Sequence, residues 1–114
     1  MLKVVLILIF IFKVSLSFSH SQLTEILPKN NVVYNKVPSQ INMKFKSSVK
    51  LVKIDMFRVE NKEKIKLDSS LLKDRSKVHI LPMPKLYPGK YRIEWRALSP
   101  DGHIIKGKSN FEVK

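Results

Sequence analysis

The residues best suited to chemistry in this sequence are its histidines, one of which closely follows an aspartate. Asp101, Gly102 and His103 form a short Asp-Gly-His segment. The glycine favours a tight turn in which a carboxylate oxygen and an imidazole nitrogen both face one metal ion. Because Asp-Gly is a common pair in turns, this segment predicts a metal site only together with further ligands.

The amino-terminal residues have the layout of a secretory signal peptide. After a basic start, Val4–Phe12 is an unbroken apolar run, and small residues follow at Ser17 and Ser19. A helix that spans a bilayer needs about 20 apolar residues. We therefore expect a cleaved leader over residues 1–19, not a membrane anchor. The mature domain would cover residues 20–114 without a transmembrane segment, with a cut after Ser17 as the competing alternative.

Cleavage after Ser19 would make His20 the first residue of the mature chain. An amino-terminal histidine offers two ligands, the free amine and the imidazole Nδ1, which close a chelate ring around a metal. Nitrogen ligands in a square arrangement suit Cu(II), which also leads the affinity order of the divalent first-row metals. The carboxylate of Asp101 and the imidazole of His103 would complete a four-donor set. We therefore predict a Cu(II) site made by His20, Asp101 and His103.

Other kinds of reactive site find little support in the sequence. Without cysteine, the chain offers neither a disulfide nor a thiolate metal site. It has three glycines, no Gly-x-Ser-x-Gly segment, and nine acidic residues scattered without an evident catalytic pair. We therefore expect a binding protein and not an enzyme.

The formal net charge of +13 raises the question of an anionic partner. Lys3 and Lys13 contribute two of these charges and lie in the predicted leader, so +11 remains for the mature chain. The lysines are spread along the sequence, and several alternate with apolar residues, as on the solvent face of a strand. We interpret them as a solvated surface and expect no nucleic-acid partner. Docking to an acidic partner or an anionic membrane is the weaker alternative.

Apolar and polar residues alternate over several short stretches, which is the pattern of half-buried strands. The clearest is Tyr91–Ala97, which places Trp95 among the inward residues. The others are Leu23–Leu27, Ile41–Phe45, Val52–Met56, Lys64–Leu67, Val78–Leu81 and Ser109–Val113. Turn residues separate these stretches, and no segment has a convincing helical period. The pattern therefore predicts an antiparallel sandwich or barrel.

The second half of the chain carries a recognisable order of motifs. A Pro88-Gly89 turn leads into Tyr91-Arg92-Ile93-Glu94-Trp95, then Ser99-Pro100-Asp101-Gly102-His103, then Gly107 and Phe111-Glu112-Val113. This order resembles the CopC family of periplasmic copper-binding proteins. The first half is similar too, through Pro28 and the stretch from Val37 to Phe45. His20 stands where members of that family begin after signal removal.

The resemblance implies a Greek-key β-sandwich of about seven strands that binds Cu(II) through His20 (amine and imidazole), Asp101 and His103. It further implies a periplasmic, monomeric carrier or store in copper homeostasis or resistance, with an inner-membrane copper transporter as a separate partner chain. Two alternatives stay open. One is a metal-free β-sandwich used in adhesion or assembly, and the other, less favoured, is a copper-dependent histidine-brace oxidase.

Some CopC-family proteins also hold Cu(I) in a methionine-rich loop, from which this sequence departs. Met43 and Met56 occupy inward positions of predicted strands, so we expect them in the core. Met83 stands alone between two prolines. His79 lies within a predicted strand, and we interpret it as a structural histidine. A Cu(I) site that involves His79 or Met83 is the open alternative.

Overall fold

Seven strands make up the described part of the chain. The computed structural model describes residues 22–70, 72 and 74–114, and these residues contain no helix. The strands are β1 (Leu23–Leu27), β2 (Val32–Tyr34), β3 (Gln40–Arg58), β4 (Glu63–Ile65), β5 (Ser76–Pro82), β6 (Gly89–Leu98) and β7 (Ile104–Val113). Accordingly, a helix able to cross a bilayer is not found within these ranges.

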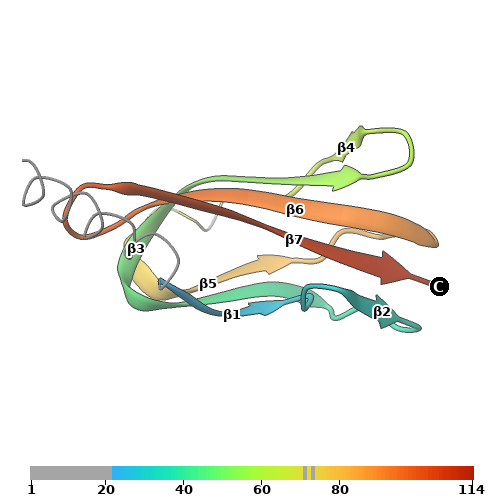
Figure 1. The fold of residues 1–114 in the computed structure, drawn as a ribbon, viewed down its shortest axis with the longest axis horizontal. Helices are drawn as coiled ribbons and strands as arrows, with labels where there is room; N and C mark the ends of the chain where they lie inside the picture. The colour runs from blue at the N-terminus through green and yellow to red at the C-terminus, as the bar shows by residue number, and fades with distance from the viewer. Residues whose placement is uncertain (1–21, 71, 73) are drawn as a thin grey trace, which may run out of the picture.

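The strands form two layers that share β3, as Figure 1 shows. One layer contains β1, the first half of β3 and β5, and the other contains β4, the second half of β3, β6, β7 and β2. All pairs are antiparallel except β2 with β7, which is parallel. The predicted all-β sandwich of about seven strands is therefore confirmed.

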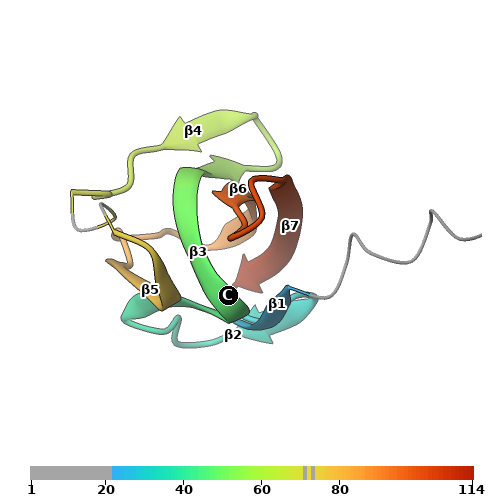
Figure 2. The ribbon, with the colours of Figure 1, turned by 90° about the vertical axis from the view of Figure 1, so that its left-hand side faces the viewer.

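The long strand β3 replaces two predicted strands. We expected separate strands at Ile41–Phe45 and Val52–Met56, yet Gln40–Arg58 runs through both. Its register with β5 shifts between Lys44 and Val49, and there the chain passes from one layer to the other (Figure 2). No glycine or proline lies in this part of the sequence to end the strand, so it bends and continues.

The core lies between the two layers and is built by the inward residues of β3, β5, β6 and β7. Trp95 is 6% exposed, and its ring packs edge-to-face against Phe45 with the centroids 5.4 Å apart. Gly107 lies opposite Trp95, where an added Cβ would come within 2.6 Å of the indole. Met43 and Met56 are fully buried. The expected core positions of Trp95 and both methionines are confirmed.

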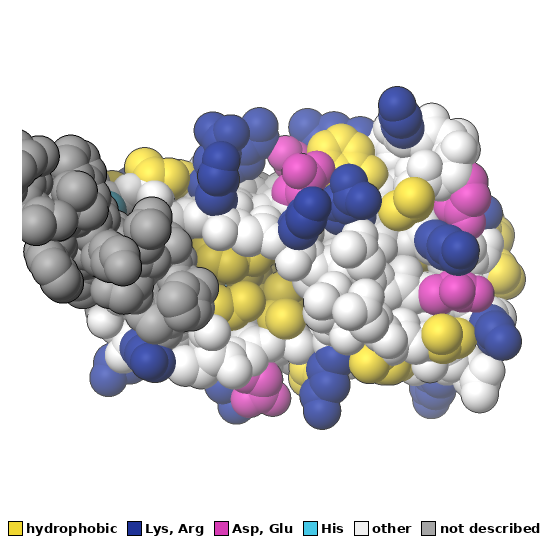
Figure 3. All heavy atoms as spheres, viewed as in Figure 1, with side chains coloured by type: hydrophobic (Ala, Val, Ile, Leu, Met, Phe, Trp, Pro, Cys, Tyr) yellow, Lys and Arg dark blue, Asp and Glu magenta, His cyan; other side chains and the backbone are white. Residues whose placement is uncertain are grey.

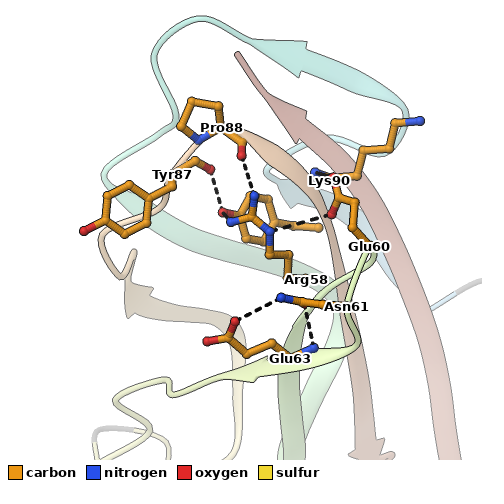
Figure 4. Close-up of polar contacts among 8 residues, drawn as sticks. Arg58, Glu60, Asn61, Glu63, Tyr87, Pro88 and Lys90 are labelled. Atoms are coloured by element: carbon orange, nitrogen blue, oxygen red, sulfur yellow. Dashed lines mark hydrogen bonds and ion pairs between the residues drawn. The ribbon is translucent and has the colours of Figure 1, made fainter.

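A polar cluster ties the start of β6 to the end of β3 (Figure 4). Arg58 Nη2 donates to the carbonyl of Pro88 at 2.8 Å, and the guanidinium lies 5.8 Å from the ring centroid of Tyr91. The Tyr91 hydroxyl in turn donates to the carbonyl of Tyr87 at 2.6 Å. These contacts anchor the first end of β6, the strand whose other end leads into the Asp-Gly-His segment.

Candidate metal centre

The Asp-Gly-His segment lies in the loop between β6 and β7. The strand ladder ends at the pair Leu98 and Ile104, and the loop begins at Ser99. The Ser99 amide donates to the carbonyl of His103 at 2.8 Å, and the Gly102 amide donates to the carbonyl of Ser99 at 3.0 Å. Gly102 has a φ of +89°, in the left-handed region that favours glycine. The loop is therefore closed by its own backbone on an anchored hairpin.

Asp101 and His103 lie together on this loop and contact each other directly, whereas the sequence predicts that both face one metal ion. The carboxylate Oδ2 of Asp101 lies 3.0 Å from Nδ1 of His103. A carboxylate is only an acceptor, so this contact places the ring proton on Nδ1 and leaves Nε2 as the nitrogen with a lone pair. The two side chains are 68% and 81% exposed, respectively. An ionised oxygen donor and an imidazole nitrogen are thus presented to solvent within one loop.

Ser99 supports Asp101 through a contact that the sequence did not predict. Its side chain is buried, and its hydroxyl donates a short hydrogen bond to Oδ1 of Asp101. The amide of His103 donates to the same oxygen at 3.3 Å. The Ser99 bond first, and then the bonds from the side chain and amide of His103, lower the pKa of Asp101 to about 2. Asp101 is therefore ionised at neutral pH.

Replacing Ser99 by alanine is expected to raise the pKa of Asp101 from about 2 toward the ordinary value of 3.8, because the largest stabilising hydrogen bond is lost. Because the pKa of Asp101 is lower in the folded protein than in the unfolded chain, its ionisation stabilises the fold at pH values above 3.8. This stabilisation is lost as the pH falls from 3.8 through 2. A carboxyl carbon NMR titration of both proteins measures the shift. An unchanged Asp101 titration in Ser99→Ala would show that the hydroxyl contributes little.

Arg75 reaches the same loop from the segment before β5. Its Nη1 lies 3.3 Å from the carbonyl oxygen of Leu98 and 3.4 Å from that of Ser99. These contacts link the edge of the first layer to the point where β6 ends. The side chain of Arg75 is exposed, so the link lies at the surface beside the loop.

The third predicted ligand, His20, lies outside the described residues. Within residues 22–70, 72 and 74–114, no group of three or more His, Cys, Asp or Glu side chains is arranged to hold a metal. Asp101 and His103 therefore form a pair in this part of the molecule. The metal site of His20, Asp101 and His103 stays a prediction.

Comparison with known proteins shows that this chain matches a protein family over nearly all of its described residues. The model of the CopC domain matches residues 23–114, which include β1 to β7 and the whole loop. The chain belongs to the CopC family. The resemblance inferred from the motifs between Pro88 and Val113 is thereby confirmed.

Two of three similar proteins carry names connected with copper. It is 26% identical over 114 residues to the copper transport protein CutJ of Bacillus subtilis (strain 168), covering 96% of this chain but only 21% of CutJ. It is 27% identical over 106 residues to copper resistance protein C of Xanthomonas campestris pv. juglandis, covering 86% and 83% of the two chains. Protein YobA of Escherichia coli (strain K12) is 30% identical over 102 residues, covering 85% and 81%.

Solved structures show the same CopC fold. The crystal structure of CopC from Methylosinus trichosporium OB3b superposes with a TM-score of 0.66 at 25% identity, covering 83% of this chain and 94% of that one. PcoC from Escherichia coli, described as a methionine-rich copper resistance protein, gives a TM-score of 0.60 at 23% identity, covering 84% and 100%. The second likeness concerns the fold alone.

The methionines of this CopC domain are arranged as core residues. Met43 and Met56 have no exposed surface. Met83 is half-buried and packs against the core cluster, and its amide donates to the carbonyl of Ser39 at 3.0 Å. Each of the three is thus accounted for by packing.

His79 has a structural role in the CopC domain. It is 4% exposed, and its Nε2 lies 3.0 Å from the carbonyl oxygens of both Val49 and Ser76. Its ring packs edge-to-face on Phe45 at a centroid distance of 5.9 Å. Since two carbonyls face Nε2, this nitrogen carries the proton and donates to them. These hydrogen bonds lie where the pairing of β3 with β5 ends. They agree with the interpretation of His79 as a bonded strand histidine.

Replacing His79 by phenylalanine is expected to lower the free energy of unfolding by about 1–3 kcal/mol, because a buried donor is lost while the aromatic packing is kept. Copper affinity should stay within about twofold of the unchanged protein, since no ligand is removed. Chemical denaturation and a Cu(II) competition titration measure the two effects. A folded His79→Phe protein with markedly weaker copper binding would identify His79 as a ligand.

Proposed function

We propose that this protein binds one Cu(II) ion and serves as a periplasmic copper carrier or store in copper homeostasis or resistance. The observation that carries the proposal is the Asp101–His103 pair, exposed on a closed loop of a CopC domain. The copper transport and copper resistance names of its relatives support it.

The ligands in this proposal are His20, Asp101 and His103. After cleavage behind Ser19, His20 would supply an amine and an imidazole nitrogen. Asp101 would supply an ionised oxygen and His103 an imidazole nitrogen, and their 3.0 Å hydrogen bond would open when both bind one ion. Three nitrogen donors and one oxygen donor suit the tetragonal preference of Cu(II). Ser99 and the His103 amide occupy Oδ1 of Asp101, so they would orient the carboxylate.

The exposure of the site favours transfer and storage over catalysis. Both side chains of the pair stand out from the loop, where a second protein can reach a bound ion. The single tryptophan is in the core, so it is not part of an exposed aromatic surface for a large substrate. A carrier needs only accessible ligands whose affinity for copper allows both its uptake and its release. We therefore propose a binding role without catalytic turnover.

The proposal predicts one equivalent of Cu(II) for the chain that begins at His20, with weaker binding as the pH falls. An amine with an ordinary pKa of about 7.7–8.0 must lose its proton to bind, and so must the imidazoles. Asp101, whose pKa is about 2, contributes nothing to this loss between pH 8 and 5. A competition titration with a copper chelator at several pH values measures it. A metal-free adhesion module would show no saturable binding.

A further inference from the structure

Three cations lie side by side across the outer face of the second layer. In the strand register, Arg96 of β6 is directly opposite Lys53 of β3 and Lys106 of β7. All three side chains are exposed. Like charges directly opposite on neighbouring strands destabilise a sheet. We call Lys53, Arg96 and Lys106 the cation row, an arrangement that the stability of the sheet alone does not explain.

The acidic residues beside the cation row leave most of its charge uncompensated. Asp55 contacts Lys53 at 3.6 Å and Lys64 at 3.2 Å. Among the residues that the structure describes, neither Arg96 nor Lys106 forms an ion pair with a carboxylate. Lys and Arg side chains also outnumber acidic ones on the face shown in Figure 3. The cation row stands out from this background because its members are in direct register.

The cation row lines a hollow of about 470 Å³ in the sheet surface. Its other charged lining residues are Asp55, Glu94 and Lys108, and Gly107 lines it as well. A flat layer of lipid headgroups cannot follow a concave surface, whereas a protruding loop of a protein can enter it. The charged lining residues are positive on balance, and the concave shape fits a protruding acidic loop better than a membrane.

The cation row is close to the Asp-Gly-His loop. Arg96 is three residues before Ser99, and Lys106 is three residues after His103. At about 3.3 Å per residue, the row lies roughly 10 Å from the loop. Ile104, between them on β7, is 56% exposed and offers an apolar contact. A partner seated on the row would therefore reach the loop as well.

We propose that the cation row and its hollow dock an acidic loop of a second protein, which exchanges copper with the adjacent site. The exchange step rests on the proposed function, but the docking does not. Complementary charge would steer the partner and set its orientation, so that binding weakens with ionic strength. Docking here would place the partner beside Asp101 and His103.

The test uses fluorescein-labelled decaglutamate as the probe and fluorescence anisotropy as the readout. The row variant combines Lys53→Gln, Arg96→Gln and Lys106→Gln. The matched control combines Lys36→Gln, Lys44→Gln and Lys46→Gln, which remove the same charge from exposed positions elsewhere. The row variant should bind about tenfold more weakly, and the control less than about twofold more weakly. Equal losses in both variants, or no binding of decaglutamate to the unchanged protein, would overturn the proposal.

Three further measurements separate the remaining outcomes. The first is binding to vesicles of phosphatidylglycerol and phosphatidylcholine. If vesicle binding depends on the cation row while decaglutamate binding does not, the row is a lipid-facing surface and the proposal is overturned. Arg96→Gln alone should unfold at an equal or higher temperature, because like charges are removed. A lower unfolding temperature would give the row a structural role instead. Cu(II) uptake should be unchanged in the row variant, and a protein that binds decaglutamate but no Cu(II) would refute the proposed function alone.

Discussion

Replacing His103 by alanine should weaken Cu(II) binding by more than about a hundredfold, since even residues outside the ligand set can change metal affinity about 10–100-fold. The substitution removes one nitrogen donor from the proposed set and also frees Oδ2 of Asp101 from its 3.0 Å contact. His103 is on an exposed loop, so the fold should be unaffected. A competition titration with a copper chelator measures the affinity, and circular dichroism checks the fold.

The His79→Phe protein is the matched control for this experiment, because it also removes one histidine. His79 is buried and bonded to two carbonyls, whereas His103 is exposed. We expect His79→Phe to lose stability and keep copper, and His103→Ala to do the reverse. Tight Cu(II) binding in a folded His103→Ala protein would contradict the proposed ligand set.

Blocking the amine of His20 should weaken Cu(II) binding on the order of a hundredfold. A removable fusion ahead of His20 turns the amine into a peptide nitrogen, so one donor of the chelate ring is lost. The same preparation after removal of the fusion, with His20 as its first residue, is the control. The two samples share residues 20–114 and differ in whether His20 is joined to the fusion or has a free amine, so the difference in affinity reports the loss of the amine.

The outcome of the amine experiment also separates two processing sites. If both samples bind Cu(II) with equal affinity, the free amine is not a ligand, and a cut after Ser17 would serve the protein as well as one after Ser19. Sequencing the amino terminus of the protein from its native compartment then decides between the cuts. A chain that begins at His20 is the result expected here.

The strand frame could be predicted because it depends on local alternation. Tyr91–Ala97 alternates cleanly, and its inward residues Tyr91, Ile93, Trp95 and Ala97 are all buried. The short strand β2 escaped prediction because Val32–Tyr34 is three residues long and pairs in parallel with β7. Its existence depends on a tertiary contact that no local pattern encodes. The continuity of β3 was missed for a similar reason, since the bend near Val49 is fixed by β5.

The proximity of Asp101 and His103 could be predicted from the sequence, whereas the contacts that support them could not. Asp101 and His103 are two residues apart, so a turn was enough to bring them together. The role of Ser99 depends on the exact closure of the loop, which directs its hydroxyl to Oδ1 of Asp101. Arg75 comes from another layer and could not be linked to the loop from spacing. For Ser99, the only signal in the sequence was a serine two residues before an aspartate in a turn.

The most direct test of the central claim is a crystal structure of the copper-loaded chain beginning at His20, with anomalous data collected at the copper absorption edge. We expect a single strong peak bonded to the amine and imidazole of His20, the carboxylate of Asp101 and an imidazole nitrogen of His103. A peak at His79 or Met83 would contradict the account. So would a copper ion at His103 that His20 does not contact.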